Sequence, residues 1–467
     1  MKKLLYLLIS LLPLSLYAQE PNCNCEQVLN KLINKVENEY PGFSAKTKET
    51  FLYSGFKENL IKQAKQADGL DCQKILKQYT DFFKDPHLWV GANGTPFSSE
   101  TTATAKSVAI DIQDFQNQVN KTKDTLEGVW STDGYRIGIK KLGKDEYVGF
   151  IIEAESTQWK PKEIKFRLFS NGTFEYALRD KSLKTGNYTL YKEGVLFLNE
   201  VSVALVKQNL QSTISKEAQA SRLNELEGFY FKKLTAKTAM LKLPSFEYQY
   251  LKQITQLIDE HQTQLENSEN LIIDLRGNPG GTTDAYQKLL PYIMGKTIRN
   301  TGAEFLATQT YINNLEAYKK TLDKNTSTTN TDKNIEALKA NLGQFVNFNA
   351  AGQPIYVEKV EVAAKSPKHI VILANKSSGS SAEYFLFVAK QSKKVKILGI
   401  PSYGALDYGN AYLVDFGCPG YQVFMPTYRA LRLPDYPIDN IGIQPDVYMD
   451  KSVKDWVAFA VKYLEEE

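Results

Sequence analysis

A serine in a short polar turn, Ser380, is the residue best suited to nucleophilic chemistry. The turn, residues 376–380, separates an apolar run at 369–373, which predicts a buried strand, from a run at 381–391 that favours a helix. A serine at such a turn presents its hydroxyl at the sheet edge, where the first free N–H groups of the helix also point. An acyl-transfer oxyanion needs donors there, and the Ser381 N–H is one. Serine also caps helices for structural reasons alone, so this segment leaves both interpretations open.

A general base must come from few candidates, because the chain contains only three histidines. His87 follows Pro86, which ends a helical pattern, and Asp85 lies two residues before it. Loop histidines are more often structural. We interpret His261 and His369 as structural, since one lies in a polar helix and the other begins a strand. His87 is therefore the candidate for proton transfer.

Two further segments carry polar groups that could serve such a serine. Residues 439–446 form a loop whose carboxylates could orient a histidine, as the third member of a triad must. Residues 274–281 follow a buried strand but lack the ending of a phosphate-binding loop and the dinucleotide fingerprint. The alternative is that Gly280 and Gly281 bring bare backbone N–H groups close to a reacting group. Asp274 and Arg276 would then stiffen the turn through a charge-assisted pair.

The elements that must position these residues predict several domains. Residues 1–18 have the layout of a secretory signal peptide, so we expect a soluble, exported protein, periplasmic or extracellular, without stable membrane insertion. Residues 19–119 predict a helical domain. Residues 126–215 predict a meander of short antiparallel strands, a small β-barrel or sandwich, whose exposed aromatics such as Trp159 could bind a ligand or belong to the core.

Residues 228–467 alternate strand and helix, which predicts an α/β core with a largely parallel sheet. We expect a helical insert at about 305–350, which is either a mobile lid or an extension on the surface. The chain is therefore expected to be a multidomain α+β protein.

Charge and cysteine content narrow the function classes. The chain has 57 basic and 53 acidic residues, and its basic residues are scattered rather than clustered. We therefore do not expect a nucleic-acid partner. Export permits disulfides, and we expect Cys23 or Cys25 to pair with Cys72. A zinc site is less favoured because no histidine lies near a cysteine. We expect no metal and no cofactor, and the oligomeric state stays open.

Four ordered motifs resemble the superfamily of tail-specific (C-terminal processing) proteases and the tricorn core protease. The superfamily's glycine turn is matched by five residues. Its nucleophile, a serine three residues before a helix-opening glutamate, maps to Ser380 through Glu383. A Gly-x-Pro-Ser-x-Gly loop begins at Gly399, and the closing Gly-Ile-x-Pro-Asp begins at Gly442. The glycine turn comprises Asp274, Arg276, Asn278, Gly280 and Gly281.

The resemblance implies a ClpP/crotonase-like core and a serine peptidase acting on polypeptide or peptide substrates. The processing proteases use a lysine base where this chain has Ala405, so the resemblance points to the tricorn-like branch. That branch implies His87 as base and Asp439 as the acid that holds it. Pro86 stands where that branch has a helper serine. The implied oxyanion donors are the N–H groups of Ser381 and of Gly280 or Gly281.

The missing lysine also supports a rival interpretation. A catalytically inactive member of the family would serve as an exported peptide- or glycan-binding protein. A third possibility is a surface protein whose β-rich domain captures the ligand. Rescue of the base by Lys376 needs a different geometry and is less favoured.

Overall fold

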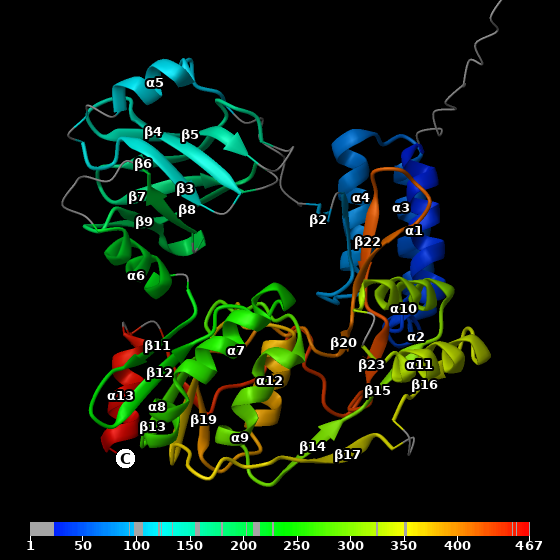
Figure 1. The fold of residues 1–467 in the computed structure, drawn as a ribbon. Helices are drawn as coiled ribbons and strands as arrows, with labels where there is room; N and C mark the ends of the chain where they lie inside the picture. The colour runs from blue at the N-terminus through cyan, green and yellow to red at the C-terminus, as the bar shows by residue number, and fades with distance from the viewer. Residues whose placement is uncertain are drawn as a thin grey trace, which may run out of the picture.

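The computed structural model contains a helical region, a β-barrel and an α/β core (Figure 1). The barrel stands apart from the helical region in this view, and the α/β core lies below both. The expected signal peptide, residues 1–18, lies outside the described residues. The structure describes residues 23–466 except 93, 98–105, 120–121, 123, 133, 155–158, 179–180, 202, 209–214, 227, 324–325, 350–352, 451 and 454.

The helical region begins with a capped amphipathic helix, α1. Asn24 and Gln27 form a capping box that satisfies free N–H groups at its start. Apolar residues at helical spacing then bury one face, and residues 28, 29, 32 and 36 have no exposed surface. Cys25 and Cys72 form a disulfide that joins α1 to α4. The helices of this region are α1 (Cys25–Glu39), α2 (Phe43–Lys46), α3 (Thr50–Ala64) and α4 (Gly69–Asp81).

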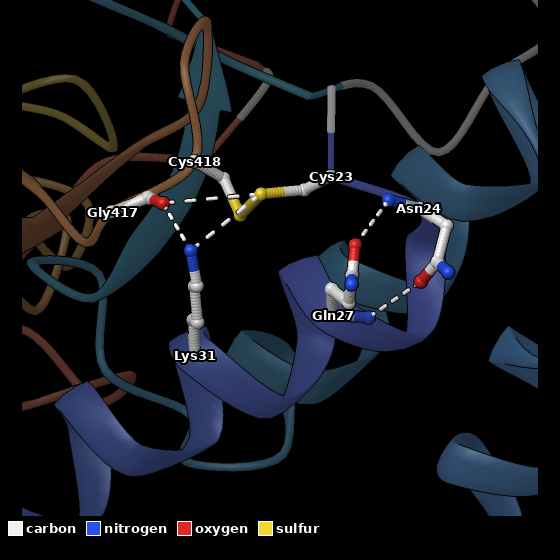
Figure 2. Close-up of a disulfide and its surroundings, with 6 residues drawn as sticks. All are labelled: Cys23, Asn24, Gln27, Lys31, Gly417 and Cys418. Atoms are coloured by element: carbon white, nitrogen blue, oxygen red, sulfur yellow. Dashed lines mark hydrogen bonds between the residues drawn. A yellow bond between two sulfur atoms is a disulfide. The ribbon is translucent and has the colours of Figure 1, made fainter. Parts of the chain in front are cut away.

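The segment after α4 joins the helical region to the C-terminal half. Strand β1 (Trp89–Ala92) pairs antiparallel with β22 (Gln422–Met425), in the order β2-β1-β22-β21. A second disulfide, Cys23–Cys418, fastens the start of the described chain to the loop between β21 (Tyr412–Asp415) and β22. Figure 2 shows Lys31 of α1 donating to the Gly417 carbonyl beside it. The expected pairing with Cys72 is thus made by Cys25, and Cys23 has a partner 395 residues away.

The β-rich region is a closed antiparallel barrel, in the order β10-β3-β4-β5-β6-β7-β8-β9. Its core includes Trp130, Phe166 and Leu196, all at most 1% exposed. Trp159 is 3% exposed and belongs to this core, which is the second of the two alternatives that the sequence left open for it. The strands are β3 (Gly128–Thr132), β4 (Tyr135–Lys141), β5 (Glu146–Ala154), β6 (Ile164–Phe169), β7 (Thr173–Ala177), β8 (Leu183–Tyr191), β9 (Val195–Leu198) and β10 (Val203–Lys207). Helices α5 (Ile112–Val119) and α6 (Lys216–Leu226) flank it, and strand β2 (Thr95–Pro96) precedes it in sequence.

The α/β core is built on a six-stranded sheet that is parallel except at the β11 edge. Alternate residues point to opposite faces, so Ile273 and Ile372 pack with α12 while Ile272 and Val371 pack with α13. The strands are β11 (Tyr230–Lys233), β12 (Thr238–Lys242), β13 (Asn270–Asp274), β18 (His369–Ala374), β19 (Val395–Gly399) and β24 (Val447–Tyr448). The helices are α7 (Leu251–Glu260), α8 (Gln262–Asn267), α9 (Leu290–Ile293), α12 (Ser381–Ala389) and α13 (Trp456–Glu466), with short 3-10 turns η2 (Tyr248–Tyr250) and η3 (Thr283–Leu289).

The insert consists of α10 (Gln309–Thr321) and α11 (Thr329–Ala340) between short strands. Lys35 Nζ of α1 donates to Thr310 Oγ1 at 2.5 Å, which ties the insert to the helical region. The remaining strands are β14 (Thr297–Thr301), β15 (Ala303–Leu306), β16 (Phe345–Val346), β17 (Ile355–Lys359), β20 (Tyr408–Gly409) and β23 (Tyr428–Ala430).

Candidate active site

Ser380 occupies the turn between β18 and α12, as its sequence context predicts. It has φ 51° and ψ −118°, and a positive φ is uncommon for a residue with a side chain. Gly280 lies against it: a Cβ added to Gly280 would come within 2.8 Å of Ser380 Cβ. Because Ser380 follows β18, it lies at the C-terminal end of the parallel sheet, where the glycine turn packs against it.

Glu383 holds this turn in place through four hydrogen bonds. Its carboxylate is fully buried. One oxygen accepts from Ser380 N at 3.0 Å and Ala405 N at 2.8 Å. The other accepts from Ser402 Oγ at 2.5 Å and Gly404 N at 2.6 Å. A buried carboxylate is tolerated when donors surround it, so Glu383 fastens the nucleophile turn to the 402–405 loop.

His87 comes to Ser380 from the helical region. Its Nε2 lies 3.3 Å from Ser380 Oγ. The loop that carries it leads directly into β1, and Trp89 on β1 stacks on Phe424 of β22 with ring centroids 5.0 Å apart. The pairing of β1 with β22 therefore fixes the position of the His87 imidazole. The distance is compatible with proton transfer from the hydroxyl.

Asp439 is hydrogen-bonded to the backbone of residues 406 and 407 and not to His87. Its Oδ1 accepts from Leu406 N at 2.8 Å and Asp407 N at 2.7 Å. Its Oδ2 is buried without a partner in the described part of the chain, and so is His87 Nδ1. The contact that the sequence resemblance implied between these two side chains is thus not formed, although each retains an unused polar atom.

Two carboxylates and one arginine near Asp439 determine its protonation state. Burial, with the neighbouring Asp85 and Asp407 carboxylates, raises the pKa of Asp439 to about 8. Arg432 pairs with Asp407 Oδ1 at 2.6 Å and also donates to the Leu406 carbonyl. Arg432 therefore neutralises Asp407 rather than Asp439, and the Asp439 carboxyl readily holds a proton.

The glycine turn has the predicted stiffening pair. Arg276 donates to both carboxylate oxygens of Asp274, at 2.8 and 2.6 Å. The Gly280 N–H donates to Asn278 Oδ1 at 2.9 Å, so it is already used within the turn. Of the two glycines named as oxyanion donors, Gly280 is thereby excluded in this conformation. In the part of the chain that the structure describes, the N–H groups of Gly281 and Ser381 have no hydrogen-bond acceptor.

A cleft of about 1120 Å³ opens over Ser380. Ser380, Ser381 and Gly281 lie on its wall, together with Tyr311 of the insert. Its other walls are rich in aromatic side chains: Tyr248, Phe305, Phe348, Tyr356, Tyr384, Phe387, Tyr412 and Tyr428. The insert thus helps to enclose the site, and the cleft is large enough for several residues of an extended peptide.

Residues 237–449 match the model of peptidase family S41. This part of the chain is an S41 peptidase domain. This match confirms the resemblance found in the sequence and supports a serine-type peptidase, a class of enzyme that acts on peptides.

Several solved structures are similar to this chain. Mature CPAF has 12% sequence identity and a TM-score of 0.48, with 91% of this chain and 92% of that chain covered. The photosystem II D1 C-terminal processing protease has 14% identity and a TM-score of 0.39, covering 93% and 95%. The tricorn protease has 13% identity and a TM-score of 0.42, covering 95% of this chain and 37% of that one. No curated protein matches the chain significantly.

A buried alanine stands where the sequence resemblance places the lysine of the processing proteases. This residue, Ala405, is 3% exposed and its N–H is bonded to Glu383. Lys376 is exposed in the turn before Ser380. The base within reach of the nucleophile is His87.

Some residues of the site could not be predicted from the sequence. The carboxylate of Glu383 was noted only as the start of a helix, and its four donors come from segments that no local pattern connects. Tyr40, whose hydroxyl lies 2.8 Å from Asp85 Oδ2, gave no signal at all. A buried tyrosine in an amphipathic helical region looks like any other core residue.

Proposed function

We propose that the chain is an exported peptidase that cleaves peptide bonds through an acyl-enzyme, with Ser380 as nucleophile and His87 as base. The observation that carries the proposal is the 3.3 Å separation of Ser380 Oγ and His87 Nε2. Ser380 Oγ attacks the scissile carbonyl carbon as its proton passes to His87 Nε2. The C–N bond then breaks, and His87 returns the proton to the leaving amine. Water hydrolyses the ester by the reverse sequence of proton transfers, releasing the acid and Ser380.

Asp439 is the residue we assign to orient the imidazole. For Nε2 to accept a proton, Nδ1 must carry one, and that N–H needs an acceptor. Asp439 Oδ2 is a buried carboxylate oxygen that has no hydrogen-bond partner among the described residues. We expect the two atoms to meet when substrate binding draws the His87 loop and the core together.

The developing oxyanion is assigned to the N–H groups of Ser381 and Gly281. Both residues border the cleft at Ser380. The N–H of Ser381 begins helix α12, so the helix dipole adds to its effect. One such donor typically contributes about 3 kcal/mol to the transition state.

Export is part of the proposal and rests on the expected signal peptide at 1–18. All four cysteines form disulfides, which is compatible with an oxidising compartment. None of the helices in the described part of the chain has the length and apolar character needed to cross a membrane.

The test is hydrolysis of an unfolded protein. The oxidised protein, purified after export, is incubated with fluorescein-labelled casein, and the products are identified by mass spectrometry. We expect cleavage that is lost in Ser380→Ala and retained in Ser377→Ala, an exposed serine of the same turn. Casein that binds without being cut would contradict the proposal and favour the inactive, peptide-binding alternative.

A further inference from the structure

Two buried side chains lie behind the His87 loop and have no part in the chemistry proposed above. Tyr40 is 2% exposed and Asp85 is 5% exposed. The Tyr40 hydroxyl donates to Asp85 Oδ2 at 2.8 Å. The other carboxylate oxygen, Oδ1, accepts from the backbone N–H of His87 at 2.8 Å. A continuous chain of hydrogen bonds therefore leads from the end of α1 to the backbone of the residue that faces Ser380.

The ring of Tyr40 is fixed from both sides of the domain boundary. Its backbone N–H bonds to the Val36 carbonyl, which anchors it at the end of α1. Phe83 of the helical region meets the ring edge-on, with centroids 5.4 Å apart. Tyr408, from strand β20 of the C-terminal half, packs on it with centroids 5.6 Å apart. The hydroxyl is thus directed at Asp85 by packing rather than by the hydrogen bond alone.

The loop is also held by the segment that follows Asp439. Lys84 has a φ of 48°, and the Leu88 N–H bonds back to the Asp85 carbonyl, so the chain turns sharply here. Asn440 Nδ2 donates to the Lys84 carbonyl at 2.6 Å. Asn440 follows Asp439, so the loop is held on one side by the segment that carries the proposed acid. On the other side it is held by Tyr40.

We propose that Tyr40 is a positioning residue that acts through Asp85 to hold His87 at hydrogen-bond distance from Ser380. This inference rests on the proposed function, because it assigns a role only if His87 is the base. Loss of the hydroxyl leaves Asp85 Oδ2 buried without its donor. The carboxyl then reorients toward another partner, and the His87 backbone loses its acceptor.

Tyr40 is suited to this role because its hydroxyl stays protonated. Burial, followed by the nearby Asp85 carboxylate, raises the pKa of Tyr40 well above its ordinary value. The hydroxyl therefore donates to Asp85 throughout the pH range in which the enzyme can work.

The test compares two tyrosine variants of the full oxidised protein. Tyr40→Phe removes the hydroxyl that reaches Asp85. Tyr53→Phe is the matched control: its hydroxyl lies in the same helical core, donating to Glu37 at 2.7 Å and lying 3.0 Å from the Tyr79 hydroxyl, but it does not contact Asp85. Apparent kcat and KM are measured on fluorescein-labelled casein, the rate of fluorophosphonate labelling of Ser380 is followed, and thermal unfolding is recorded for each variant.

We expect Tyr40→Phe to lower kcat and the labelling rate about 10- to 100-fold with KM unchanged, since a displacement of about 1 Å has an effect of that size. Tyr53→Phe should stay within twofold of the wild type at a similar loss of thermal stability. Equal kcat values in the two variants would overturn the inference. If Tyr40→Phe does not fold, Asp85→Asn gives the same test, and an unchanged kcat there would overturn it too.

The same experiment separates this inference from the proposed function. Wild-type labelling of Ser380 that is lost in His87→Ala and unaffected in Tyr40→Phe would overturn the role of Tyr40 alone. Labelling that survives in His87→Ala would overturn the proposed base, and the role of Tyr40 would fall with it.

Discussion

His87 Nε2 lies 3.3 Å from Ser380 Oγ although 293 residues separate them in the chain. The two residues belong to different regions, and the pairing of β1 with β22 brings them together. The disulfide Cys23–Cys418 closes the same connection beside β22 (Figure 2). The site is thus assembled between two halves of the molecule.

Removing the long-range disulfide should weaken both stability and activity. We expect the double variant Cys23→Ser, Cys418→Ser to lose about 2–4 kcal/mol of unfolding free energy, as is typical for a native disulfide. Casein hydrolysis should fall as well, because the His87 region is less firmly held. The matched control is Cys25→Ser, Cys72→Ser, which opens a separation of 47 residues inside the helical region. Equal effects on hydrolysis at equal stability would contradict the prediction.

Glu383 should be required for the shape of the nucleophile turn. Glutamine has one carbonyl oxygen for four donors, so Glu383→Gln places an NH₂ group against at least one of them. We expect a loss on the order of 3 kcal/mol in urea unfolding, and a lower fluorophosphonate labelling rate. Glu269→Gln provides the comparison, since that carboxylate is exposed and pairs with Lys368 at the surface. It should cost less than about 1 kcal/mol.

Asp439 should make stability depend on pH. Its pKa is raised to about 8 by burial and by Asp85 and Asp407, against about 3.9 in an unfolded chain. The folded state therefore binds this proton more tightly, and that contribution to stability is fully present below about pH 4 and lost as the pH rises through about 8. We expect the wild type to lose stability relative to Asp439→Asn across that window. A stability difference that does not change with pH would count against this assignment.

The same variant, Asp439→Asn, should lower activity. An asparagine amide cannot ionise, so it cannot become the carboxylate that would stabilise a charged imidazole. We expect kcat on casein to fall by about 10⁴-fold, the scale seen when the acid of a serine triad becomes an amide. Activity within tenfold of the wild type would show that Asp439 does not serve His87.

Gly281 should be needed as a donor, and Gly277 should not. A Cβ at Gly281 would lie 2.1 Å from the Phe246 carbonyl oxygen, and its φ of 142° is unfavourable for a side chain. Gly281→Ala must therefore move the N–H that we assign to the oxyanion, and we expect a loss in kcat on the order of 100-fold. Gly277→Ala meets nothing within 4 Å, although its φ of 85° is also positive. It should reduce stability with little effect on kcat, and a similar kcat loss in both variants would argue against the donor role.

The sequence predicted the parts of the site that depend on local pattern. The apolar run before Ser380 became β18, the run after it became α12, and the Asp274–Arg276 pair formed as expected. Such features depend on periodicity and on turn chemistry between neighbours in the chain. The barrel, too, followed from short alternating strands and turn signals, but the burial of Trp159 depends on closure of the whole sheet.

What could not be predicted depends on contacts between distant segments. The disulfide between Cys23 and Cys418 depends on the pairing of β1 with β22. The Tyr40–Asp85 bond requires the end of α1 to meet the loop after α4. The use of the Gly280 N–H by Asn278 depends on the detailed path of one turn, which residue types alone do not fix.

The central claim is that His87 activates Ser380, and active-site labelling tests it most directly. The oxidised protein is treated with a fluorophosphonate, and the adduct is mapped by mass spectrometry in the wild type, Ser380→Ala and His87→Ala. The account predicts an adduct on Ser380 in the wild type and none in either variant. An adduct on Ser380 that forms at the wild-type rate in His87→Ala would contradict it.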